Sequence, residues 1–164
     1  MRLALALLFA ASPAMAQELT YDWAPTASCV AAATDYDTRQ ACIGRAAEAC
    51  MEATPGGYST VGMSGCTSRE TDDWDARLNA VYREIMAQAK TADEENKEYG
   101  GYAPSQAEAL RDMQRAWIAF RDAKCMYERS QWGGGTGAGP AGASCYLYET
   151  ARQTLYLEAS RMGG

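Results

Sequence analysis

The chain has 164 residues, with 21 acidic and 15 basic side chains, no histidine and a net charge of −6 at pH 7. The absence of histidine excludes histidine-ligated metal sites and Ser-His or Cys-His catalysis. The acidic balance disfavours nucleic acid and favours cationic partners. Nothing in the composition predicts a metal ion or another cofactor.

The first 16 residues, MRLALALLFAASPAMA, have the layout of a secretory signal peptide. Arg2 precedes an apolar run over 3–11, and the Ala-Met-Ala end has the small-x-small pattern of a cleavage site. The run is about half the length that a membrane span needs. We therefore expect cleavage after Ala16, a periplasmic or secreted protein without a membrane anchor, and a single domain over 17–164. Losing Arg2 leaves 14 basic against 21 acidic side chains, a net charge of −7.

Six cysteines follow the expected cleavage site, and an even number in an exported chain indicates three disulfides. Each sequential pair straddles a turn signal, TDYDT, PGGYST or GGGTG, at nearly equal distances on either side. Antiparallel helices joined by these turns would bring each pair together. We expect structural bonds Cys29–Cys42, Cys50–Cys66 and Cys125–Cys145. The chain has no Cys-x-x-Cys pair that would suggest redox activity.

The region before the long helices predicts two short helices and a loop. Thr26 is expected to cap a helix over 27–33, and Asp37 to cap a second helix that ends near residue 53. The glycine-containing segment over 54–65 is expected to be a loop.

A long amphipathic helix is predicted next, to about residue 96, with a capping box of Thr67 and Glu70 at its start. The acidic cluster DDWD over 72–75 suits the positive end of the helix dipole. The apolar residues of this helix recur every three or four positions, as expected for a buried stripe: Trp74, Leu78, Val81, Ile85 and Ala89.

A second capping box, Ser105 with Glu108, predicts a helix to about residue 129. The glycine-rich segment after it is expected to be flexible, and Ser144 to cap a last helix to about residue 161. The whole pattern predicts an all-α, disulfide-stapled antiparallel bundle of about four to five helices. The apolar stripe of the second long helix, expected to be core, contains Leu110, Met113, Trp117 and Phe120.

Arg121 lies on the flank of this second stripe, beside Gln114 and Cys125. Charge next to a packing seam is seldom left unpaired. We expect Arg121 to pair with an acid on the facing helix, for which Asp75 is the candidate. The alternative is that Arg121 presents its charge to a partner.

Four segments occur in the order WDARLNAVYREI (74–85), QRAWIAFRDAKC (114–125), GGT (134–136) and TARQTL (150–155). Together they resemble the LprI-type lysozyme inhibitor family, small exported bacterial helical domains, over about 66–157. The resemblance implies a binding protein without catalytic residues. Some members carry a lipidated cysteine at the cleavage point, where this chain has Gln17. The matching motif positions are Leu78, Asn79, Tyr82, Gln114, Trp117, Arg121, Asp122, Cys125, Thr150 and Arg152.

The leading hypothesis is stoichiometric occlusion of lysozyme or another cationic envelope protein, without catalysis. The loops over 54–65 and 131–143 could project into a target. We favour the second, because Trp132 is a potential binding anchor and Gly135 and Thr136 lie on adaptable backbone. Trp132 could instead pack back onto the bundle. The alternatives are an envelope interaction module with an unknown partner and a cell-wall glycan hydrolase that uses the acidic cluster.

Overall fold

The structure is a computed structural model that describes residues 18–162, so the expected cleavage after Ala16 lies outside the described residues. This part of the chain is all-α, without strands, and carries three disulfides, as predicted. It has one helix more than expected. The six helices are α1 (Ala24–Ala32), α2 (Tyr36–Gln40), α3 (Arg45–Ala53), α4 (Thr60–Glu98), α5 (Gln106–Ser130) and α6 (Ala138–Met162).

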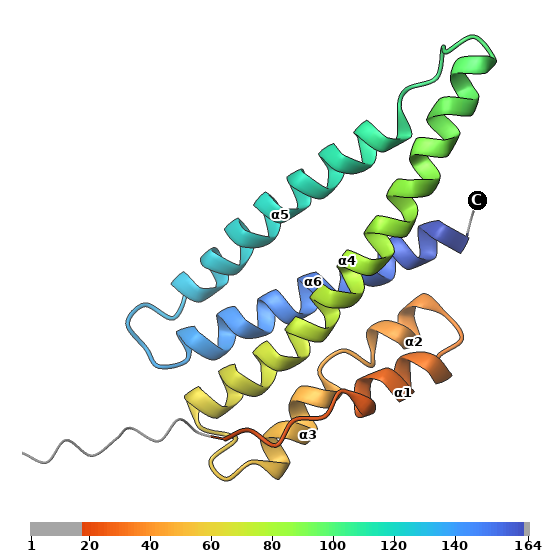
Figure 1. Ribbon diagram of the computed structural model, residues 1–164. Helices are drawn as coiled ribbons and strands as arrows, with labels where there is room; N and C mark the ends of the chain where they lie inside the picture. The colour runs from red at the N-terminus through yellow and green to blue at the C-terminus, as the bar shows by residue number, and fades with distance from the viewer. Residues whose placement is uncertain (1–17, 163–164) are drawn as a thin grey trace, which may run out of the picture.

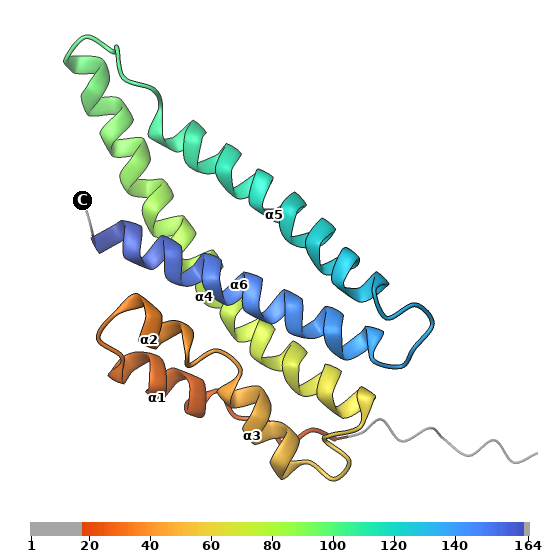
Figure 2. The same cartoon turned by 180° about the vertical axis from the view of Figure 1, so that it is seen from behind.

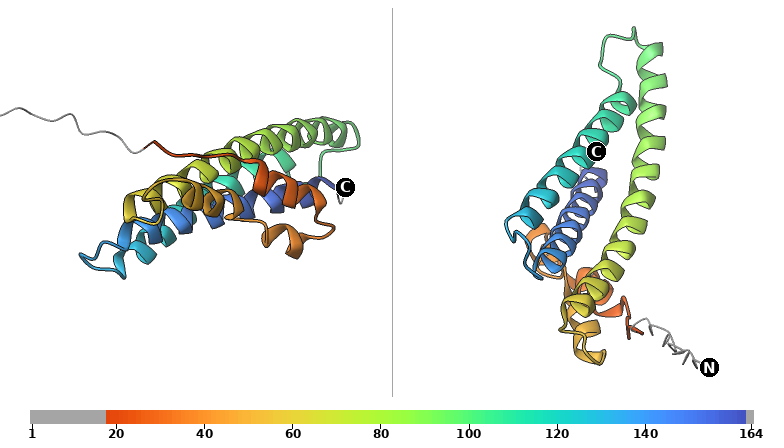
Figure 3. Two further views of the ribbon diagram at one scale, coloured as in Figure 1. Left: turned by 90° about the horizontal axis from the view of Figure 1, so that it is seen from below. Right: turned by 90° about the vertical axis from the view of Figure 1, so that its left-hand side faces the viewer.

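The helices form two groups. The long helices α4, α5 and α6 run up, down and up, so that α5 is antiparallel to both of its neighbours (Figure 1). The short helices α1, α2 and α3 pack together against one side of α4 and α6, away from α5 (Figure 2). Seen from the left-hand side of Figure 1, α6 lies between α4 and α5 over much of its length (Figure 3, right).

The helix expected to end near residue 53 is broken into α2 and α3. Asp35, not Asp37, caps α2 and forms a capping box with Thr38. The chain then turns at Gly44, whose φ of 96° lies in the left-handed region that glycine adopts without steric cost. The first helix also begins earlier than expected, with Pro25 in its first turn and Thr26 buried. The predicted bond Cys29–Cys42 is confirmed.

Helix α4 begins eight residues earlier than predicted, so the expected capping box of Thr67 and Glu70 is wrong. Ser59 is the N-cap, and its hydroxyl accepts a hydrogen bond from the amide of Gly62 at 3.1 Å. Ser59 offers the same capping chemistry about two turns upstream. The Cys50–Cys66 bond, confirmed here, holds this extra helical segment against α3.

Glu70 is fully buried and joins the short helices to α4. Its carboxyl oxygens accept from the amides of Gly44 and Ala47 at 2.8 and 2.7 Å, at the N-terminus of α3. They also accept from the hydroxyl of Thr26 at 3.0 Å and the indole of Trp74 at 3.2 Å. Glu70 therefore satisfies amides at the start of α3 that the helix itself leaves without partners.

The predicted stripe of α4 is buried except for Ile85, which is half-buried. Trp74 packs with α6 and the short helices, whereas Leu78 and Val81 face a second cluster that includes residues of α5 and α6. On α5 the prediction is partly wrong, because Phe120 is 58% exposed. Helix α5 covers only one side of the α4–α6 pair, so its buried stripe is narrower than the periodicity suggests.

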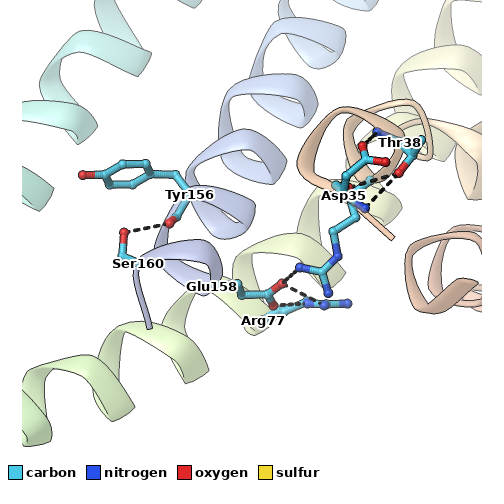
Figure 4. A network of polar contacts seen from close by, with 7 residues as sticks. Asp35, Thr38, Arg77, Tyr156, Glu158 and Ser160 are labelled. Carbon is cyan, nitrogen blue, oxygen red and sulfur yellow. Dashed lines mark hydrogen bonds and ion pairs between the residues drawn. The ribbon is translucent and has the colours of Figure 1, made fainter. Parts of the chain in front are cut away.

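An ion-pair network ties α2 to α4 and α6 (Figure 4). The buried carboxylate of Glu158 on α6 accepts from Arg77 of α4, with one bond of 3.0 Å, and from Arg39 of α2 at 3.3 Å. Because Glu158 is shielded from water, removal of its cationic partners would leave a buried unpaired charge.

Helix α5 begins as predicted, whereas helix α6 begins earlier than predicted. Ser105 caps α5 as expected. Helix α6 begins at Ala138 rather than after Ser144, because Pro140 falls in its first turn, where a missing amide proton costs no helical hydrogen bond. The connecting loop is therefore short, and the predicted Cys125–Cys145 bond, which is confirmed, lies at its base.

Asp93, in the last part of α4, reinforces the start of α5. Its carboxylate accepts from the hydroxyl of Ser105 at 2.6 Å and from the amides of Gln106 and Ala107 at 2.7 and 3.1 Å. These hydrogen bonds, with that from Ser105 the largest cause, hold the pKa of Asp93 below its ordinary value of 3.8.

The stabilising contribution of Asp93 is expected to disappear in acid. A carboxyl group with a lowered pKa in the folded state stabilises fully above its unfolded pKa, and this stabilisation is lost as pH falls through the folded pKa. The hydrogen-exchange protection factors of the amides in the first turn of α5 should therefore decrease when the pH is lowered below about 4. In Asp93→Ala they should already be low at neutral pH. Identical protection in both proteins at every pH would contradict the capping role.

No helix in the described part of the chain is long and apolar enough to cross a membrane. Within residues 18–162, no group of three or more cysteine, aspartate or glutamate side chains is placed to hold a metal ion.

Candidate functional site

Residues of α4, α5 and α6 line a groove. It lies toward the end of α4 and α5 at which the two ribbons diverge (Figure 1). It consists of two adjoining pockets of about 290 and 310 Å³ that share Ser68, Ala143 and Tyr146. The outer pocket reaches Arg129 and Gly139, beside the α5–α6 loop. The inner pocket is lined by Ser68, Thr71, Asp72 and Asp75 of α4, Arg121 of α5, and Ala143, Tyr146 and Thr150 of α6.

Arg121 does not pair with Asp75, and that prediction is wrong. Its guanidinium pairs with Asp122, the next residue, at 2.9 Å. It also lies over the rings of Trp117 and Tyr146, 4.9 and 5.4 Å from their centroids. The inner pocket separates α5 from α4 at this level, so Asp75 and Arg121 line the same pocket without an ion pair.

The acidic cluster does not serve the N-terminus of its helix, because α4 begins twelve residues before Asp72. Asp73 accepts from the hydroxyl of Tyr21 at 2.6 Å; burial and then this hydrogen bond raise the pKa of Tyr21. Asp75 accepts from the amide of Asn79 at 2.8 Å. Within the described residues, Asp72 has neither a hydrogen bond nor an ion pair to its side chain.

Thr150, a motif residue, is 1% exposed, and its hydroxyl has no hydrogen-bond partner among the described residues. The neighbouring Thr154 is different, because its hydroxyl donates within α6 to the carbonyl of Thr150 and lies 3.2 Å from the carbonyl of Trp74. A buried hydroxyl without a partner costs free energy. The inner pocket therefore contains a polar group that the fold leaves unsatisfied.

The other motif residues mainly hold the long helices together. Leu78 is buried, and Tyr82 and Trp117 pack around the same apolar cluster. Gln114 of α5 accepts from Gln153 of α6 at 3.0 Å. Arg152 pairs with Glu149 on its own helix.

The α5–α6 loop carries the three residues predicted to contact a partner. Trp132, Gly135 and Thr136 are all exposed, with 56% of Trp132 open to solvent. The Trp132 ring rests against the backbone of Gly137, where a β-carbon would collide with it. The indole therefore packs on its own loop, and much of its surface stays exposed. The disulfide Cys125–Cys145 fixes the base of this loop.

Half of the other candidate loop, over 54–65, belongs to α4, which begins at Thr60. Its remaining turn carries Tyr58, which is exposed and donates to Glu48 of α3 at 2.7 Å. Thr54 is buried and accepts from the amide of Thr20 at 3.0 Å. This turn is tied to its surroundings and offers less projecting surface than the α5–α6 loop.

These features define a small, disulfide-stapled helical domain with an open polar groove and a projecting aromatic loop. The chain matches the family described as lysozyme inhibitor LprI over residues 50–157, and it belongs to that family. The match begins upstream of the 66–157 expected from the motifs, because it includes the end of α3 and the start of α4.

Two relatives give no further functional information. The uncharacterized 17.7 kDa protein in the puhA 5′ region of Rhodobacter capsulatus is 29% identical over 139 residues, which cover 84% of this chain and 85% of the relative. An uncharacterized protein of Rhizobium meliloti (strain 1021) is 28% identical over 100 residues, 61% of this chain and 72% of the relative. No solved structure matches the chain significantly.

Proposed function

We propose that this protein is an exported inhibitor that binds a cationic cell-wall hydrolase of the lysozyme type and occludes its cleft stoichiometrically. Membership of the LprI lysozyme inhibitor family is the observation that carries the proposal. Three disulfides support an oxidising compartment such as the periplasm or the cell exterior. Inhibition of this kind requires neither catalysis nor a cofactor.

Charge supports the choice of target. The chain after the expected cleavage carries a net charge of −7, whereas lysozymes of the C type are cationic and hold two carboxylates in their cleft. An acidic inhibitor would be steered to such an enzyme. Because exposed charges are screened beyond a Debye length of about 10 Å at 0.1 M salt, inhibition should weaken as salt is added.

The α5–α6 loop is the segment proposed to enter the cleft of the target and act as a wedge that blocks it, since bulk charge alone cannot block a cleft. Trp132→Ala is expected to weaken inhibition about tenfold or more, because exposed tryptophans are frequent binding anchors. Deletion of 134–136 should have a similar effect, because it removes the loop backbone while Cys125–Cys145 keeps the helices joined. The measurement is the inhibition constant for lysozyme acting on cell walls.

Tyr102→Ala is the matched control for Trp132→Ala. Tyr102 is an aromatic residue that is 96% exposed in the α4–α5 loop, at the opposite end of the bundle. This control should inhibit as the parent does. Unchanged inhibition by both loop variants, with folding verified by circular dichroism, would show that the α5–α6 loop is not the wedge.

The proposed function is tested by measuring lysozyme activity on cell walls with and without the purified, oxidised protein at low salt. Loss of activity is expected. Unaffected lysozyme at low salt would exclude the inhibitor function. Release of glycan fragments by the protein alone would instead support a hydrolase that uses Asp72 and Asp75.

A further inference from the structure

We propose that the inner pocket receives one lysine or arginine side chain of the target protein. This inference rests on the proposed function, because it takes the target to be cationic, and it adds the place where that charge is bound. The pocket opens between α4 and α5 on the same groove as the α5–α6 loop, so one partner could contact both.

The α4 wall of the pocket is rich in hydrogen-bond acceptors. Asp72 has no partner for its carboxylate among the described residues, and Asp75 is bonded only to the neutral amide of Asn79. The hydroxyl of Thr71 already donates to a backbone carbonyl, which leaves its oxygen free to accept. Lysine and arginine side chains carry donors alone, so this wall matches what they need.

Thr150 provides an independent indication of a ligand. It lines the pocket from α6, and its buried hydroxyl lacks a partner within the described residues. A hydroxyl oxygen is an acceptor for an ammonium or guanidinium group. Binding of a cationic side chain would therefore supply a partner that the fold does not.

Arg121 does not cancel the negative charge of the pocket. Asp122 neutralises its guanidinium, and the rings of Trp117 and Tyr146 hold it in place. Asp72 and Asp75 then remain as two uncompensated charges. An anionic ligand would meet these carboxylates at close range, so the charge balance favours a cation.

The size of the pocket fits a single side chain. Its volume of about 290 Å³ is at the lower end of the range of roughly 300–1,000 Å³ for small-molecule sites. A projecting lysine or arginine can enter such a space and keep its aliphatic part against Ala143 and the ring of Tyr146.

The test compares the affinity of C-type lysozyme for the parent, Asp72→Asn/Asp75→Asn and Glu95→Gln/Glu98→Gln, by calorimetry at low salt. Glu95 and Glu98 are exposed acids at the far end of α4, so the control removes the same charge from the same helix. We expect the pocket variant to bind at least about tenfold more weakly than the parent and the control to differ by less than about threefold. Equal affinities of the two variants would overturn the proposal and leave the inhibitor function standing.

Thr150→Val tests the contribution of the hydroxyl to binding separately from that of the two carboxylates. Valine has nearly the same shape, and the lost hydroxyl has no partner in the free protein, so the melting temperature should not fall. Lysozyme binding should weaken about fivefold or more, because hydrogen bonds to charged groups are stronger than neutral ones. Unchanged binding would remove Thr150 from the site.

A capped lysine, N-acetyl-lysine methylamide, tests the pocket if the parent fails to bind lysozyme, an outcome that would reject the proposed function. At millimolar concentration it should shift the amide signals of Ser68, Asp72 and Tyr146 in the parent and in the Glu95→Gln/Glu98→Gln control. The shifts should vanish in Asp72→Asn/Asp75→Asn. Absence of these shifts in the parent would overturn the pocket proposal on its own.

Discussion

Glu70→Ala is expected to lower the free energy of unfolding by about 3–4 kcal/mol, since it leaves three buried donors and one partly buried donor without an acceptor, at roughly 1 kcal/mol each. Two of these donors are the amides of Gly44 and Ala47 at the start of α3, and the others come from Thr26 and Trp74. The donors of Thr26, Ala47 and Trp74 are buried and cannot reach water without opening the contact between the short helices and α4.

Chemical unfolding of three variants checks this expectation. Glu70→Gln keeps the size of the side chain but places an amide donor against one of the four donors, so its loss should be about half that of Glu70→Ala. Glu95→Ala, an exposed position on the same helix, should change stability by less than about 0.5 kcal/mol. Equal stabilities of Glu70→Ala and Glu95→Ala would contradict the role of Glu70.

Trp74→Ala is expected to cost about 3–5 kcal/mol, as for other buried tryptophans. The Trp74 ring is fully buried, meets the ring of Trp23 edge-on at 5.3 Å, and donates to Glu70. Its removal would open a cavity between the two groups of helices and also take away one of the bonds to Glu70.

Trp117→Ala is the natural comparison, because Trp117 is also a helical tryptophan but only half-buried under Arg121. Loss of the Trp117 side chain should lower the free energy of unfolding by about 1–3 kcal/mol, because folding buries less apolar surface at Trp117 than at Trp74. Urea denaturation of both variants shows which substitution lowers the free energy of unfolding more. A Trp117→Ala protein less stable than Trp74→Ala would show that the main core lies between α4 and α5 instead of between α4, α6 and the short helices.

Local chemistry explains which parts of the fold could be predicted. Apolar spacing located Trp74 and Leu78 on one buried face, and turn signals between sequential cysteines gave all three disulfides. Glu70 was misassigned because a threonine three residues before a glutamate also fits a capping box. The spacing of four from Glu70 to Trp74 on the buried stripe was the signal that would have placed Glu70 in the core.

The sequence predicted only part of the candidate site. The loop with Trp132 was visible in the sequence because glycine clusters locally. The inner pocket was not, since Asp72, Arg121 and Thr150 come from three helices and meet only after α5 and α6 have folded onto α4. The periodicity of α5 also could not reveal that Phe120 is exposed, because it does not tell how many neighbours a helix has.

The most direct test of the inhibitor function is a titration of C-type lysozyme with the purified, oxidised protein at low ionic strength, with activity and heat of binding measured on the same mixtures. Lysozyme activity should fall linearly and reach its minimum near one equivalent of the protein. The heat of binding should also end near one equivalent. Lysozyme activity should recover as salt is added. Full lysozyme activity in the presence of several equivalents of the protein would contradict the proposed function.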